Sequence, residues 1–391
     1  MSHALFSLSP DLKALREEGY YLRVQAGFLV MREVPYVDGQ RQIRTGTLIS
    51  SLDLAGDVTR RPESHVAYFD GELPCGIGGT PLAGLVNNSG QHNLAPGLAA
   101  RHFLSSKPEC GYADYHEKMS TYANIISGPA AVHRPGLSAR VFRAPEQDEE
   151  TVFNYLETAS ARAGISTLTE RLTADRVAII GLGGTGSYVL DLVAKTPVPQ
   201  IHLFDEDDFL QHNAFRAPGA PTLDDLREAP KKVDYLKGIY SKMHRGVVAH
   251  PVALGAANLT LLDGITFAFV CMDGGEAKRQ VVAKLESIGA GFIDVGMGLE
   301  LVDGSLGGIL RVTASMLGKR EHVHQGRVSF QGGGANDIYS TNIQVADLNA
   351  LNAILAVIKW KKLRGFYRDL EREFHCTYTT DGNQMENGDR E

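Results

Sequence analysis

The sequence contains few cysteines, and they follow no pairing pattern. Its 391 residues include four cysteines, at positions 75, 110, 271 and 376. Small secreted domains that depend on disulfides carry many more cysteines at regular spacings. A disulfide framework is therefore excluded as the basis of the fold, and the cysteine content predicts a protein of the reducing cytoplasm.

The sequence also lacks long apolar runs and an excess of basic residues. No stretch approaches the ~18 apolar residues that a membrane-spanning helix needs, and residues 1–10 lack the basic start and apolar run of a signal peptide. With 39 Lys and Arg against 46 Asp and Glu, the formal charge is −7. This balance predicts no broad basic face, and we expect neither a membrane nor a nucleic acid as partner.

The length of the chain predicts two domains. The first, at residues 1–145, reads as a small α+β domain that carries no recognisable motif, and we expect it to recruit a partner or substrate. Residues 146–150, an acidic stretch, predict a linker. Within the first domain we expect helices at 9–18 and 113–126, strands at 21–34, 42–52, 65–69 and 138–142, and a Gly- and Asn-rich loop at 77–96.

The second domain, at residues 151–391, begins with an expected helix at 151–163 and then alternates strands with helices. Such alternation specifies a parallel sheet with right-handed crossovers. Strands are expected at 176–180, 200–204, 247–252, 267–271 and 291–295, and helices at 185–194, 223–243 and 275–288. The expected domain is completed by a hairpin at 297–302 and 308–313, a helix at 342–363 and a strand at 376–380. The predicted fold is α/β, a Rossmann-like doubly wound and mainly parallel sheet preceded by the smaller α+β domain.

The most informative segment is the glycine turn between the first two strands of this sheet. Gly181, Gly183 and Gly186 fit the spacing G-x-G-x-x-G directly after an apolar strand. The first glycine permits a tight turn, the second lets the backbone approach a phosphate, and the third lets the helix pack closely. The helix would direct its N–H groups and positive dipole end at the phosphates, and Asp205, after the next strand, would accept hydrogen bonds from ribose hydroxyls.

The residues that follow Asp205 distinguish between nucleotide chemistries. A nicotinamide dehydrogenase needs little charge beyond the ribose acid. Here Asn213, Arg216 and Lys231 follow, and the fourth strand ends at Asp273. Two cations, an amide and a second acid near the carboxyl ends of the strands suit a triphosphate and its metal ion.

The order of these motifs resembles the ThiF/MoeB-type adenylyltransferases, which include the ubiquitin-activating enzymes. The motifs are Gly-Leu-Gly-Gly-x-Gly-Ser, Asp-x-Asp-x-Phe-x-x-x-Asn-x-x-Arg, Pro-Lys and Cys-x-Asp, and the resemblance covers roughly residues 165–365. It implies that ATP and Mg²⁺ are used to adenylate the C-terminal carboxylate of a ubiquitin-like protein, and that the enzyme is a homodimer. The chain resembles in particular the activators of bacterial ubiquitin-like conjugation systems, which work beside a conjugating enzyme.

The resemblance also assigns roles to single residues. Asp205 would bind the ribose, Asn213 and Arg216 the phosphates, and Asp273 the metal ion; Lys231 would also bind phosphate, with Lys232 as an adjacent contender. The resulting candidates for nucleotide binding are Gly181, Gly183, Gly184, Gly186, Asp205 and Asp207, and those for catalysis are Asn213, Arg216, Lys231 and Asp273, with Asp273 also as metal ligand.

The chain departs from the family pattern in four ways. Ala217 stands where the family has Gln, no Cys-x-x-Cys provides a structural zinc site, and only Arg171 approximates an upstream arginine of relatives. The segment before the last helix contains no cysteine, although Ser340 and Thr341 lie there as hydroxyl alternatives or helix caps. The acyl acceptor therefore stays open, and the adenylate could pass directly to a partner.

Two alternatives remain beside the activation of a ubiquitin-like protein. The same site could adenylate a small molecule, a peptide or a tRNA base, or the chain could be a non-catalytic nucleotide-binding subunit. His322 and His324 have the i, i+2 spacing of a metal-binding pair, but no third ligand is evident, and surface histidines are the simpler interpretation.

Overall fold

The computed structural model describes residues 2–143, 151–330 and 343–390. The chain divides into two compact units, Met1–Glu170 and Arg171–Glu391, and each is described by itself. The expected linker at 146–150 lies outside the described residues.

The first unit is built around a six-stranded antiparallel sheet with the strand order β1-β2-β3-β6-β8-β7. Helix α3 packs on one face, and the core there includes Tyr115, Met119 and Tyr122. A smaller apolar cluster lies on the opposite face. The elements are α1 (Ser2–Leu8), α2 (Pro10–Glu17), β1 (Tyr21–Gln25), β2 (Phe28–Val37), β3 (Ile43–Ser51), β4 (Leu54–Ala55), β5 (Val58–Thr59), β6 (Val66–Asp70), β7 (Val86–Ala95), β8 (Leu98–Ser105), α3 (Tyr115–His133), α4 (Ala159–Ala163) and α5 (Ser166–Glu170).

Four expectations for this part of the chain were wrong in detail. The expected strand 21–34 is interrupted by a turn at Ala26 and Gly27, both with positive φ, which starts a new strand. The expected loop 77–96 contains β7, a mostly exposed edge strand whose polar sequence gives no apolar alternation. Residues 138–142 contribute only an isolated bridge between Tyr20 and Arg140. The helix expected at 151–163 is confined to α4.

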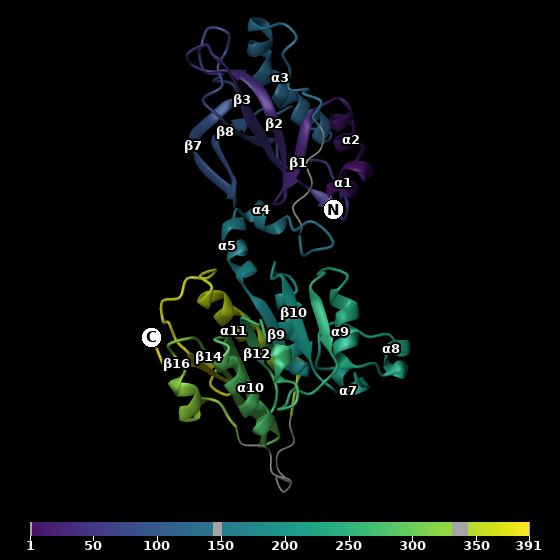
Figure 1. Cartoon of the computed structure of the whole chain (residues 1–391), viewed down its shortest axis with the longest axis vertical. Helices are drawn as coiled ribbons and strands as arrows, with labels where there is room; N and C mark the ends of the chain where they lie inside the picture. Colours follow the sequence, from purple (N-terminus) through teal and green to yellow (C-terminus); the bar gives the residue numbers. More distant parts are fainter. Residues whose placement is uncertain (1, 144–150, 331–342, 391) are drawn as a thin grey trace. The chain divides into compact units, whose positions relative to one another are not determined.

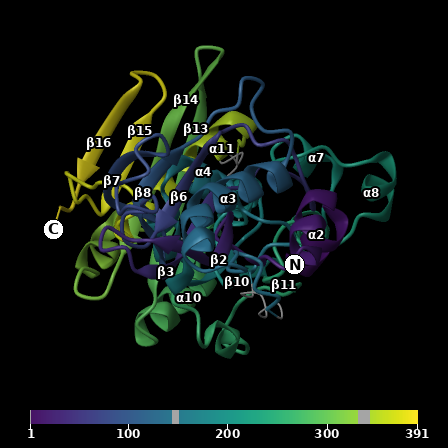
Figure 2. The ribbon, with the colours of Figure 1, turned by 90° about the horizontal axis from the view of Figure 1, so that it is seen from above.

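The second unit is an eight-stranded sheet with the strand order β11-β10-β9-β12-β13-β14-β15-β16. The strands from β11 to β13 are parallel, and the last three are antiparallel; Figure 2 shows β13 to β16 side by side. The elements are η1 (Arg171–Ala174), β9 (Arg176–Ile180), α6 (Gly184–Val193), β10 (Gln200–Phe204), α7 (Gln211–Ala214), α8 (Leu223–Glu228), α9 (Lys232–Tyr240), β11 (Val247–His250), η2 (Leu259–Leu262), β12 (Phe267–Val270), α10 (Glu276–Ser287), β13 (Gly291–Val302), β14 (Ser305–Ser315), η3 (Val323–Arg327), α11 (Ala346–Leu363), β15 (His375–Thr379) and β16 (Gln384–Gly388).

Helices cover both faces of this sheet, as the alternation of elements predicts (Figure 1). One core joins α6, α9 and α11 to residues such as Val177 and Ile179 of β9. The other joins α10 to Ala178 and Ile180, the neighbours that point to the opposite face. The predicted doubly wound α/β fold, preceded by a smaller α+β domain, is confirmed.

Three boundaries in the second unit differ from expectation. The helix expected at 223–243 is broken because Ala229 adopts a left-handed conformation before Pro230, which separates α8 from α9. The two strands expected at 291–295 and 297–302 form one continuous strand, β13. The edge strand β16 was not expected, because its exposed residues carry no apolar alternation.

Candidate nucleotide site

The strand order places a topological switch point between β9 and β12. From β9 the chain leaves through α6 to β10 on one side, and β12 lies on the other side. Open α/β sheets bind ligands beyond the carboxyl ends of their strands at such a point. The glycine turn lies there: Gly181 has a φ of +90°, and a Cβ on it would lie 2.6 Å from the carbonyl oxygen of Cys271, which follows β12.

The other glycines of the turn differ in their surroundings. A Cβ on Gly186 would lie 1.9 Å from the carbonyl oxygen of Gly181, so this position closes the turn onto the helix. A Cβ on Gly184 would lie 2.0 Å from Nδ2 of Asn349. Gly183, the N-cap of α6, has no atom within 4 Å of such a Cβ. Space is therefore open beside Gly183, at the N-terminal end of α6, which is the end of a helix that attracts anions such as phosphate.

Asp205 anchors this turn to the end of β10. Its Oδ2 accepts a hydrogen bond from the backbone N–H of Leu182 at 2.7 Å, and its Oδ1 accepts one from the N–H of Asp207 at 2.9 Å. Its side chain is largely buried, whereas that of Asp207 is exposed. Asp205 therefore fixes the glycine turn and also lies where the sequence predicts ribose binding.

The two adjacent lysines lie in different environments. Nζ of Lys232 is 3.5 Å from Oδ1 of Asp205 and 2.6 Å from Oδ2 of Asp207, and its side chain is 8% exposed. Lys231 is exposed and pairs with Asp208 at 2.8 Å, a hydrogen bond that raises the pKa of Lys231 above its usual value. Of the two candidates, the structure brings Lys232 against the acids of the turn.

Asn213 and Arg216 lie on and just after the short helix α7. Asn213 is buried, and its Oδ1 accepts a hydrogen bond from the N–H of Leu210 at 2.8 Å. The backbone N–H of Arg216 donates to the carbonyl of Asn213 at 3.1 Å. The Nε of Arg216 is buried without a hydrogen-bond partner within the part of the chain that the structure describes. Such a donor fits an anionic acceptor supplied by a ligand.

Asp273 is exposed and does not serve as a helix cap. The N-cap of α10 is Gly275, with a φ of 135°. No group of three or more His, Cys, Asp or Glu side chains able to hold a metal ion occurs in residues 2–143, 151–330 and 343–390. One carboxylate fits Mg²⁺, which keeps several waters and is commonly held by one or two carboxylates together with substrate phosphates. The available carboxylate is therefore compatible with a magnesium nucleotide.

Asn349, which lies against the turn from α11, was not among the residues predicted from the sequence. Asn349 is fully buried, and its Oδ1 accepts a hydrogen bond from Oγ1 of Thr185 at 3.0 Å. Its signal in the sequence is a pair of amides, Asn349 and Asn352, on the apolar side of a helix. Arg171 lies elsewhere, with its guanidinium bonded to the carbonyl of Gly365.

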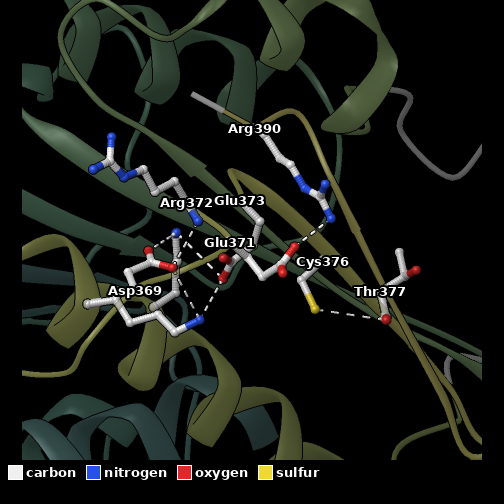
Figure 3. A network of polar contacts seen from close by, with 9 residues as sticks. Asp369, Glu371, Arg372, Glu373, Cys376, Thr377 and Arg390 are labelled. Atoms are coloured by element: carbon white, nitrogen blue, oxygen red, sulfur yellow. Dashed lines mark hydrogen bonds and ion pairs between the residues drawn. The ribbon is translucent and has the colours of Figure 1, made fainter.

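Three of the four cysteines have thiols that are harder to ionise than a free thiol. Burial raises the pKa of Cys75, Cys271 and Cys376, and Cys110 lies exposed in a loop. Figure 3 shows Cys376 near a polar network; its Sγ lies 3.9 Å from the carbonyl oxygen of Thr377. In that network Lys359 and Lys362 pair with Asp369 and Glu373 at 3.0 to 3.6 Å.

The remaining candidates do not form a second centre. His322 is buried and contacts the carbonyl oxygen of Ala314 at 2.8 Å through Nε2, whereas His324 pairs with Glu286 at 3.1 Å. The two histidines therefore have separate protein partners. Ser340 and Thr341 lie outside the described residues.

The comparisons with known protein families agree with this geometry. The model of the ThiF family matches residues 158–316, so this part of the chain is a ThiF-family domain. Residues 10–158 match a domain of unknown function, DUF6791. No curated protein matches the chain.

Solved structures similar to the chain include PaaA and the E. coli protein MccB. PaaA has 17% sequence identity and a TM-score of 0.44, with 57% of this chain and 75% of PaaA covered. MccB has 17% identity and a TM-score of 0.46, with 59% of this chain and 68% of MccB covered. A structure of E. coli MccB with ATP has 16% identity and a TM-score of 0.41, with 59% and 67% covered.

The structure also bears on the relation to membranes. None of the helices in the described ranges combines the length and apolar character needed to cross a membrane.

Proposed function

We propose that the protein is an ATP-dependent adenylyltransferase that activates the C-terminal carboxylate of a ubiquitin-like protein. The products are an acyl-adenylate, passed on for conjugation, and pyrophosphate. Two observations carry the proposal: the turn is open at Gly183, and Arg216, which follows α7, has a buried Nε without a partner among the described residues. The exposed acid Asp273 follows the neighbouring strand. A ribose acid alone would suit many nucleotides, whereas the added cation and acid suit the reaction of a triphosphate.

Each side chain has a distinct role in this proposal. The N–H groups at the start of α6 bind the phosphates, and Asp205 binds the ribose. Arg216 and Lys232 neutralise charge that develops on the phosphates, and Asn213 holds the segment that carries Arg216. Lys231, which is exposed and paired with Asp208, adds positive charge beside the phosphates. When bound, Mg²⁺ would supply further neutralisation, with Asp273 as its protein ligand. The attacking carboxylate is ionised at neutral pH and needs no general base.

The proposal extends to partners. The first unit recruits the ubiquitin-like protein or a conjugating enzyme, and the active form is a cytoplasmic homodimer within a bacterial conjugation system. Since burial raises the pKa of three of the four thiols, the acyl group passes to a partner rather than to one of these three thiols.

The test is ATP–pyrophosphate exchange by the purified chain, with and without ubiquitin-like proteins that end in an exposed glycine tail. Exchange should require such a partner and should fall at least 100-fold in Asp273→Ala. The matched control is Asp263→Ala, which removes an acid paired with Lys284 at 2.6 Å and should leave exchange within twofold.

Other results would redirect the assignment. Exchange that proceeds with a small molecule, a peptide or a tRNA, and without a partner protein, would replace the proposed substrate while retaining adenylation. Absence of ATP binding in the presence of Mg²⁺ would instead support a non-catalytic subunit.

A further inference from the structure

Asn349 on α11 contacts the first turn of α6 more closely than ordinary helix packing requires. A Cβ on Gly184 would lie 2.0 Å from Nδ2, 2.3 Å from Cγ and 2.6 Å from Oδ1 of Asn349. The whole carboxamide therefore occupies the space that a side chain at position 184 would fill. The glycine is needed here because of a residue on another helix.

A hydrogen bond also joins Asn349 to the first turn of α6. Oγ1 of Thr185 donates to Oδ1 of Asn349 at 3.0 Å. Thr185 follows Gly184, and both belong to the first turn of α6, which begins directly after the open position Gly183. The contact and the hydrogen bond together fix the rotation and the position of that turn relative to α11.

Asn349 retains this place at an energetic cost. It is fully buried, and its Nδ2 has no hydrogen-bond partner among the described residues. An unsatisfied buried donor is unfavourable, so an apolar side chain would serve better if this position only filled the core. The cost is consistent with a side chain that is needed for the contact with the turn.

We propose that Asn349 is a positioning residue that sets the phosphate-binding turn from α11 through Gly184 and Thr185. This inference rests on the proposed nucleotide site and adds a residue to it. Asn349 acts on the nucleotide only through the turn. Its loss should therefore weaken ATP binding and leave the chemical step nearly unchanged.

The substitution Asn349→Leu removes the amide and keeps a similar volume. We expect the Kd for ATP to rise about tenfold, which corresponds to the loss of about one hydrogen bond. In pyrophosphate exchange the KM for ATP should rise by the same factor while kcat stays within twofold, because ground-state and transition-state binding are lost equally. The matched control is Asn352→Leu, which removes the neighbouring buried amide that donates to the carbonyl of Gly296 at 3.1 Å; its Kd should stay within twofold of wild type.

A second variant removes the same hydrogen bond by changing its donor. Thr185→Val removes the donor and leaves α11 untouched, so it stays informative even if Asn349→Leu folds poorly. The double variant should bind ATP no more weakly than the weaker single variant, because both remove one interaction. Additive effects would show that the two residues do not act through this hydrogen bond, and an unchanged Kd accompanied by a lower Tm would show a purely structural role for Asn349. Either result would overturn the assignment.

The binding assay also separates this inference from the proposed function. If wild type and Asn349→Leu bind ATP equally, the nucleotide site stands and the role of Asn349 is refuted. If wild type does not bind ATP, both the proposed function and the inference fail.

Discussion

Two glycines of the turn should have different roles, because the fold requires Gly186 and the ligand requires Gly183. In Gly186→Ala the new Cβ would lie 1.9 Å from the carbonyl oxygen of Gly181 and 3.3 Å from Cβ of Cys271. The first neighbour is backbone, which cannot move aside as a flexible side chain can. Overpacking of this kind costs about 1–3 kcal/mol, and for a unit of this size each kcal/mol lowers Tm by about 2–4 °C.

Gly183→Ala is the matched change three residues earlier in the same motif. Its Cβ meets no atom within 4 Å, and the φ of −69° is one that alanine readily adopts. The fold should tolerate it, with a change in Tm of about 1 °C or less. The methyl group would, however, enter the open space at the N-terminal end of α6 that the proposed function assigns to a phosphate, so ATP binding should weaken at least tenfold.

Two measurements on both variants decide the matter: Tm by differential scanning calorimetry without nucleotide, and Kd for ATP by titration calorimetry with Mg²⁺. We expect a lower Tm only in Gly186→Ala, and a binding defect without a Tm change in Gly183→Ala. Wild-type ATP affinity in Gly183→Ala, or equal losses of Tm in the two variants, would refute the separation of roles.

Three further predictions follow from individual contacts. Lys232→Met should raise the KM for ATP at least tenfold and Lys231→Met less than threefold, since only Lys232 is buried against the acids of the turn; the reverse order in exchange kinetics would contradict this. Burial lowers the pKa of Lys118 to about 8, so above that pH the unfolded state binds more protons than the folded state and the free energy of unfolding should rise with pH. Between pH 7 and 9.5, wild type should gain about 2 kcal/mol relative to Lys118→Met in denaturant titrations. The same pH dependence of the free energy of unfolding in both proteins would refute this prediction. Asp175→Leu leaves the guanidinium of Arg364 without its partner at 2.7 Å, which should cost about 3 kcal/mol and lower Tm by about 10 °C; an unchanged Tm would show that the ion pair is dispensable.

The segment around the glycine turn could be read from the sequence because its information is local. The apolar run 176–180, the glycine spacing and the acid at 205 are close together in the chain, and the structure places β9, α6 and β10 almost where expected. Local patterns also explain the break at Pro230 in retrospect, since proline disfavours a helical conformation in the residue before it.

Other features depend on contacts that no local pattern contains. The hydrogen bond between Thr185 and Asn349 joins residues 164 positions apart, so a sequence window around either residue shows nothing unusual. The choice between Lys231 and Lys232 depends on where α9 begins, and the left-handed Ala229 makes Lys231 the N-cap and Lys232 the first residue of the helix. The strand β7 is polar and mostly exposed, and it is held by pairing with β8 rather than by burial.

The side-chain charges at the carboxyl ends of the strands bear on the proposed role of a metal ion. The described acids Asp205, Asp207, Asp208 and Asp273 outnumber the cations Lys231, Lys232 and Arg216 at this edge. Lys232 lies 3.5 and 2.6 Å from two of those acids, so its charge is shared between them and a bound ligand. A triphosphate brings several further negative charges to this edge, and the side chains alone cannot balance them. A magnesium ion beside Asp273 would make up the difference, which is why the loss of this exposed carboxylate should impair exchange while leaving the fold unchanged.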